Sequence, residues 1–123
     1  MDALHLETVA KSVIEKTMLR LPENIRCATE ACAIEIAYIK ECHTSGEALE
    51  SDLLGLFEGR CHSDAESEHV DDLPRVRLFL DNIWDYAEHD RTLFSDEVRL
   101  TLLHELGHYF GLNESQVEVL GLA

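Results

Sequence analysis

The segment from Thr101 to Glu114 reads H-E-x-x-H-x-x-G-x-x-E from its first histidine, and a helix would bring those two histidines to one face. Residues four apart lie on one face of a helix, so His104 and His108 can direct two imidazoles at one metal ion. Glu105 is rotated from His104 by about 100°. Its carboxylate is therefore expected beside the metal, where a general base for the hydrolytic water belongs.

Gly111 provides a place for this helix to end, because glycine tolerates the left-handed backbone of C-terminal caps. The chain can then turn back and offer Glu114 as a third ligand. Three protein ligands with an open fourth position describe a catalytic zinc site. In the alternative, Glu118, one helical turn past Glu114, is the fourth ligand. Zinc held by four side chains would make a non-catalytic module that binds a partner protein.

The residues flanking the two histidines are largely apolar, which argues against a solvated helix face. Histidines buried there without a partner would carry a desolvation cost, and a bound metal removes it. An acidic protein without metal is the remaining, weaker alternative. The apolar flank consists of Val98, Leu102, Leu103, Leu106 and Phe110.

We expect the helix to begin after Ser95, a good N-cap residue. Asp96 and Glu97 would then occupy the first turn, where negative charge suits the helix dipole. The run to Phe110 contains no proline and one glycine. That residue, Gly107, costs on the order of 1 kcal/mol relative to alanine. Close approach by a strand or substrate and tight packing against a sheet explain it equally well.

The length of 123 residues predicts one domain, residues 1–123, with one core. The net charge of −15 argues against nucleic-acid binding and against docking on anionic membranes, since both partners would be repelled. A solvated acidic surface explains the charge, and a basic protein or peptide partner is compatible with it. The sequence does not indicate an oligomeric state.

The N-terminus has no basic region followed by an apolar one, so it does not resemble a secretory signal. No apolar run approaches the roughly 20 residues that span a bilayer. We therefore expect a cytoplasmic protein whose four cysteines are free thiols. A second metal site from Cys42, His43, Cys61 and His62 matches no standard zinc spacing, and ordinary loop residues are favoured.

The rest of the chain alternates short helices and strands. Residues 4–19 predict an amphipathic helix, which the Leu21-Pro22-Glu23 turn follows. Strands are expected at 31–39, where helix competes, at 54–59 and at 75–80. Residues 43–52 are expected to be a loop or to include a short helix near 47–53, 61–72 an exposed loop, and 82–89 and 114–120 short helices. This order predicts an α+β domain, a small sheet with helices packed on one side.

Several segments together resemble the mini-zincins, a family of small bacterial zincin-like metallopeptidases. The resemblance covers nearly the whole chain. The segments that carry it are L-P-E at 21–23, L-G-L-F-E-G at 54–59, L-P-R-V-R-L-F at 73–79, V-R-x-T-x-x-H-E-x-x-H-x-x-G at 98–111 and V-L-G at 119–121.

The resemblance implies a minimal zincin-like core, a small β-sheet packed with an N-terminal helix and an active-site helix. It implies zinc held by His104, His108 and Glu114, with Glu105 as catalytic base. The larger metzincins carry a histidine at the third ligand position and a methionine after the helix. This chain has Glu114 at that position, and its only methionines are Met1 and Met18.

These observations predict a zinc-dependent peptidase that cleaves peptides or proteins with a zinc-activated water. Glu105 would take the proton of the water and deliver it to the leaving amine. The strand at 76–80 is a candidate to bind an extended peptide along its edge, although plain core is favoured. His62, His69 and Tyr109 are candidates to lie near the metal. Tyr109 is also a candidate to stabilise the oxyanion, with a buried or surface aromatic as the favoured alternative.

Overall fold

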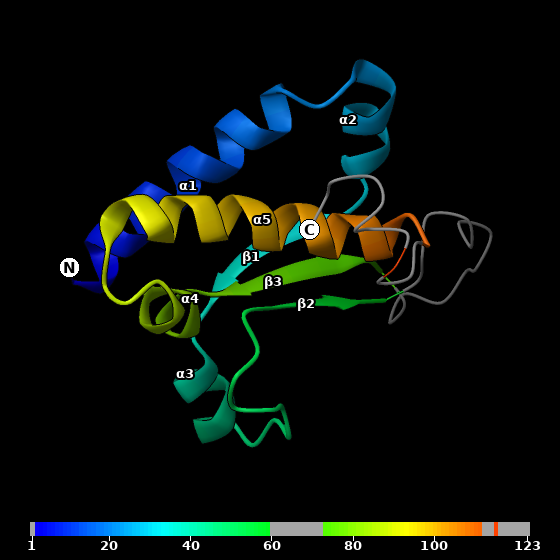
Figure 1. The fold of residues 1–123 in the computed structure, drawn as a ribbon. Coiled ribbons are helices and arrows are strands. Elements are labelled where there is room, and N and C mark those ends of the chain that lie inside the picture. Colours follow the sequence, from blue (N-terminus) through cyan, green and yellow to red (C-terminus); the bar gives the residue numbers. More distant parts are fainter. Residues whose placement is uncertain (1, 60–72, 112–114, 116–123) are drawn as a thin grey trace.

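The computed structural model describes residues 2–59, 73–111 and 115 of the chain. In chain order the elements are α1 (Ala3–Leu19), α2 (Glu23–Thr29), β1 (Ala33–Ala37), α3 (Ile39–Thr44), β2 (Gly55–Glu58), β3 (Arg75–Phe79), α4 (Leu80–Tyr86) and α5 (Arg91–Tyr109). Figure 1 shows the long helix α5 lying across the sheet with α1 beside it. The predicted α+β class is therefore confirmed.

The described strands form one mixed sheet in the order β1-β3-β2. The central strand β3 pairs in parallel with β1, where Val76 is opposite Ile34. It pairs antiparallel with β2, where Val76 is opposite Phe57. Residues 31–39, for which helix competed with strand, thus contain β1. The local sequence did not decide between helix and strand here. Parallel pairing with β3, in which Ala33 lies opposite Arg75, 42 positions later, favours the strand.

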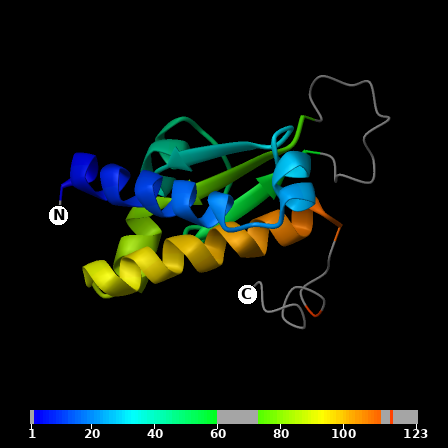
Figure 2. The same cartoon turned by 90° about the horizontal axis from the view of Figure 1, so that it is seen from above.

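One face of the sheet packs against α1 and α5, and the main core lies between these layers (Figures 1 and 2). Side chains alternate along a strand, and in β3 Val76 and Leu78 are fully buried on this face. α5 meets them with a stripe of fully buried residues at helical spacing. The stripe consists of Phe94, Val98 and Leu102.

The opposite face of the sheet carries a smaller second cluster, made by Ile39 and Cys42 of α3 with Phe79 of β3. The sequence had predicted helices on one side of the sheet only. This detail was wrong, because α3 packs on the opposite face. The start of α3 is capped from a distance, because the carboxylate of Asp81 accepts hydrogen bonds from the backbone N–H groups of Ile39 (2.9 Å) and Lys40 (3.2 Å). This long-range cap explains why sequence reading missed α3.

The helix α5 begins earlier than predicted. Its N-cap is Asp90, whose carboxylate accepts a hydrogen bond from the Leu93 N–H at 2.9 Å, and Ser95 lies within the helix. Both residues are good caps by type. Burial of Phe94, whose ring lies nearly perpendicular to that of Trp84, favours the earlier start. Glu97 consequently lies in the second turn instead of the first.

The other sequence predictions have mixed outcomes. The first helix is confirmed as α1, while α2, which begins after Pro22, was missed. The helix predicted at 82–89 occurs as α4 and begins two residues earlier. Cys27, Cys32 and Cys42 are free thiols, and burial raises the pKa of Cys32 to about 11. The predicted loop at 61–72 lies outside the described residues, as does the helix at 114–120 except for Ser115.

A membrane-crossing helix would need a long, mostly apolar stretch, and none of the helices in the described parts of the chain has one.

Candidate active site

The last turns of α5 bring His104 and His108 together as their spacing predicts. Their Nε2 atoms are 3.2 Å apart, and the two rings meet edge to face with centroids 4.9 Å apart. Two nitrogens bound to one tetrahedral zinc at about 2.0–2.1 Å would be separated by roughly 3.3 Å. The pair therefore fits a single zinc ion.

Glu105 lies beside this pair and is buried, with 7% of its surface exposed. One of its carboxylate oxygens and the two histidine nitrogens all lie within 4.8 Å of one another. The histidines are half-buried, so the cluster reaches the surface while the carboxylate is shielded. A shielded carboxylate next to two imidazoles can exchange a proton with a small molecule held at the histidines.

The strand β2 covers Glu105 at very close range, and this needs a glycine at position 55. A Cβ atom placed there would lie 2.6 Å from the Thr101 methyl, 3.1 Å from Cγ of Glu105 and 3.3 Å from the Arg77 carbonyl oxygen. Any larger residue would push the strand away from the helix. Gly55 thus fixes how closely β2 approaches the side chain of Glu105.

The helix carrying these residues ends as the sequence predicts. Gly111 has φ +81°, in the left-handed region, and its N–H donates to the carbonyl of His108 at 2.9 Å. Gly107, within the last turns, is buried. The predicted third ligand Glu114 and the alternative fourth ligand Glu118 lie outside the described residues.

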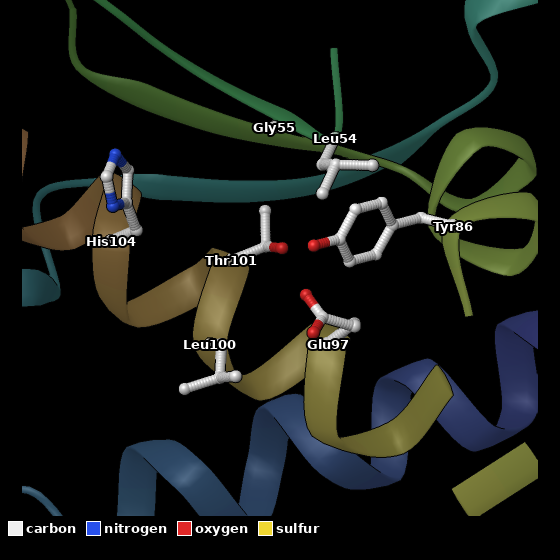
Figure 3. Close-up of a pocket in the computed structure, with 7 residues that line it drawn as sticks. All are labelled: Leu54, Gly55, Tyr86, Glu97, Leu100, Thr101 and His104. Atoms are coloured by element: carbon white, nitrogen blue, oxygen red, sulfur yellow. The ribbon is translucent and has the colours of Figure 1, made fainter. Parts of the chain in front are cut away.

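A cavity of about 430 Å³ opens from His104 along α5 toward the start of the helix. Figure 3 shows β2 and the residue before it on one side, α5 on the other, and the Tyr86 ring from α4 at the far end. The lining residues are Leu54, Gly55, Tyr86, Glu97, Leu100, Thr101 and His104. The metal-site candidate is therefore one end of an elongated pocket.

Comparison with known families agrees with this geometry. A family model described as zincin-like metallopeptidase matches residues 29–122, which is most of the chain. The chain belongs to this family. No curated protein matches it.

Within this zincin-like domain, the structure corrects one substrate-binding hypothesis. β3 was a candidate to pair with an extended peptide, but both of its edges are already occupied by β1 and β2. It is core, as the alternative interpretation held. Among the described strands, β2 is the edge strand that contacts α5 near the site.

Two further side chains have structural surroundings. Tyr109, a candidate for oxyanion stabilisation, is buried, and its hydroxyl donates to the Ala28 carbonyl at 3.0 Å, so the structural alternative holds. Arg77 faces the side of the sheet away from α5 and pairs with Glu47 and Glu58. His62, His69 and Cys61 lie outside the described residues.

Sequence reasoning missed three features of this zincin-like site: the close approach at Gly55, and the roles of Tyr86 and Glu97 in the pocket. One signal was available for Glu97. It precedes His104 by seven residues, or two helical turns, so both lie on one helix face. The segment L-G-L-F-E-G at 54–59 included Gly55 without indicating its close contact, and no local pattern marks Tyr86, because the neighbours of both residues come from distant parts of the chain.

Proposed function

We propose that the protein is a zinc-dependent peptidase whose active site is built on the C-terminal half of α5. The observation that carries the proposal is the 3.2 Å separation of the Nε2 atoms of His104 and His108, with the buried carboxylate of Glu105 beside them. Membership of the zincin-like metallopeptidase family supports the same reaction class. Glu114 is proposed as the third protein ligand.

Each residue has a distinct part in this proposal. The Nε2 atoms of His104 and His108 would hold zinc. Zinc, when bound in such a site, lowers the pKa of a water toward about 7 and polarises the scissile carbonyl. The carboxylate of Glu105 takes a proton from the water that attacks the peptide carbonyl. It then delivers this proton to the nitrogen of the leaving amine. Gly55 keeps β2 close enough to shield that carboxylate.

The free edge of β2 is the proposed docking strand for the substrate backbone. β2 pairs with β3 along one side, and no strand in the described ranges pairs with its other side. An extended peptide can add to such an edge through main-chain hydrogen bonds. Because Gly55 of β2 lies against Glu105, a peptide paired there would pass alongside the histidines.

The test combines metal analysis with peptide cleavage in tag-free protein, since a histidine tag would itself bind metal. We expect about one zinc per chain, lost in His104→Ala, and cleavage of some members of a fluorescence-quenched peptide library. Glu105→Gln should keep the zinc and lower turnover by about 10²–10⁴-fold, as expected for loss of a general base.

The same experiment separates the alternatives. Full activity of Glu105→Gln would refute the mechanism. One tightly bound zinc coordinated by four side chains, without cleavage of any peptide, would favour the non-catalytic module that binds a partner protein. No zinc after reconstitution at neutral pH would refute the metal site itself.

A further inference from the structure

The pocket beside His104 ends in a partly buried carboxylate, and the proposed reaction does not use it. Glu97 lines the pocket two helical turns before His104. In the described part of the chain it has no ion-pair partner. Burial, and then the nearby charge of Asp96, raise the pKa of Glu97 above its ordinary value. A cation placed beside this carboxylate would relieve that cost.

Three oxygen-bearing side chains lie together at this end of the pocket. In Figure 3 the carboxylate of Glu97, the hydroxyl of Tyr86 and the hydroxyl of Thr101 point toward one another at the end of the pocket away from His104. Carboxylate and hydroxyl oxygens suit an ammonium or guanidinium group, which offers only donors. Tyr86 is 63% exposed, so this end also admits water to a charged group.

The pocket has the length of a long basic side chain. Leu54 and Leu100 contribute apolar side chains to its lining, and Figure 3 shows Thr101 between His104 and the end occupied by Glu97 and Tyr86. The Cα atoms of Glu97 and His104 are about 10 Å apart along the helix. A lysine reaches about 6 Å from Cα to Nζ, and the glutamate side chain extends to meet it. Basic side chains commonly pack their stems on apolar surface while their charge remains hydrated.

We propose that this pocket is a specificity site for a lysine or arginine side chain adjacent to the cleaved bond, with Glu97 as the residue that selects positive charge. The inference rests on the proposed peptidase function and adds its substrate class, peptides with basic residues. The net charge of −15 also favours the approach of such peptides.

The first test measures binding without turnover. Zinc-loaded Glu105→Gln protein is titrated with fluorescein-labelled alanine pentapeptides whose central residue is lysine, norleucine or glutamate. Norleucine keeps the four-carbon stem and lacks the charge. We expect the lysine peptide to bind about tenfold more tightly than the norleucine peptide. Adding Glu97→Gln should bring this ratio close to one, and Glu97→Lys should favour the glutamate peptide.

Asp96→Asn is the matched control. It removes the same charge from the neighbouring, exposed position of α5, outside the pocket lining. It should leave the lysine-to-norleucine ratio unchanged if Glu97 acts locally. An equal loss of preference in both variants would show general electrostatic attraction and overturn the specificity pocket. Equal or undetectable binding of the lysine and norleucine peptides would also overturn it.

The second test compares cleavage by the wild type of library peptides that differ only in lysine or norleucine beside the cleaved bond. A preference for lysine in kcat/KM that Glu97→Gln removes supports the inference. Cleavage without this preference refutes the pocket and leaves the peptidase intact. A binding preference without cleavage of any peptide refutes the peptidase and leaves the pocket as a binding site for basic peptides.

Discussion

The two faces of the sheet each bury a charged residue, but with different neighbours. On the face away from α5, Arg77 is 5% exposed and lies between two carboxylates. Its Nη1 is 3.0 Å from Glu47, and its Nε donates to Glu58 at 2.7 Å. On the α5 face, Glu105 is 7% exposed, and its partners in the candidate metal cluster are the imidazoles of His104 and His108.

This difference separates a buried charge that the fold itself pairs from the buried charge for which we propose a catalytic role. The chain itself supplies the opposite charge for Arg77, and the ion pairs join β3 to β2 and to the segment after α3. Imidazole ligands beside Glu105 instead suit a site that takes up a cation from solution. Equal burial therefore says little about the role of a charged residue until its neighbours are known.

The largest expected effect on stability comes from removing a partner of Arg77. Glu58→Ala leaves the buried guanidinium without its Nε acceptor. We expect a loss of about 2–3 kcal/mol in the free energy of unfolding, below the full cost for a buried pair because Glu58 is itself 34% exposed. Urea denaturation of metal-free protein measures it.

Glu35→Ala is the control for that change. It removes the same charge from the adjacent strand β1, but the ion pair described for Glu35 is with Arg75, whose side chain is 40% exposed, so the loss should stay below about 1 kcal/mol. The double variant Glu58→Ala, Arg77→Met should recover much of the stability, because the buried guanidinium is removed together with its partner. A double variant as unstable as Glu58→Ala would contradict the structural role of the ion pair.

A smaller effect is expected at the contact between β2 and α5. Gly55→Ala places a methyl group 2.6 Å from the Thr101 side chain, and we expect a loss of about 1–2 kcal/mol. Thr101→Ser removes the contacting methyl group, so the double variant should regain part of this loss. Thermal unfolding measures both. Wild-type stability in Gly55→Ala alone would show that the strand and helix are not in close contact.

The pH dependence of two carboxylates should have opposite signs. Hydrogen bonds from Cys42 and Arg77 lower the pKa of Glu47, so its stabilisation is present above the unfolded pKa and is lost as pH falls through the folded pKa. Burial raises the pKa of Glu97, so its contribution is favourable below the unfolded pKa and is lost as pH rises through the folded pKa.

Urea midpoints of the metal-free glutamine variants test these signs. At pH 7, Glu47→Gln should be less stable than the wild type and Glu97→Gln slightly more stable. Both differences should shrink below pH 4. Two variants that shift in the same direction at pH 7 would contradict the assigned environments of these carboxylates.

The smallest stability effect is expected at Glu105. In metal-free protein, Glu105→Gln should unfold within about 1 kcal/mol of the wild type, or be more stable, because it removes a desolvated charge and keeps the shape. Glu105→Gln would then lower turnover with little effect on stability, whereas Glu58→Ala would lower stability. A loss above 2 kcal/mol would instead make Glu105 a structural charge like Arg77.

Much of the framework followed from the sequence. The spacing of His104 and His108 predicted that both lie on one helix face. The alternation of apolar and charged residues in 75–80 predicted that Val76 and Leu78 lie on the same face of the strand. Both depend on local backbone geometry, which successive residues determine. The helix end at Gly111 was equally predictable, because the left-handed backbone depends on one residue.

Other features depended on distant neighbours. Asp81 caps α3 from about 40 residues away, which no local pattern reveals. The sequence predicted a start after Ser95 for the last long helix, whereas α5 begins after Asp90, and the burial of Phe94 favours this earlier start. The α+β class was correct, while the second packed face of the sheet was not predicted because α3 was not recognised.

The sequence by itself determined the chemistry available to this protein: two imidazoles and a carboxylate on one helix, in a strongly acidic chain. Only the tertiary structure decided which charges form ion pairs, which strands lie at the edges of the described sheet, and that Glu97 and Tyr86 meet at the end of a pocket. The physical reason is that ligand spacing on a helix is set by local backbone geometry, whereas burial and charge pairing depend on residues brought together by folding.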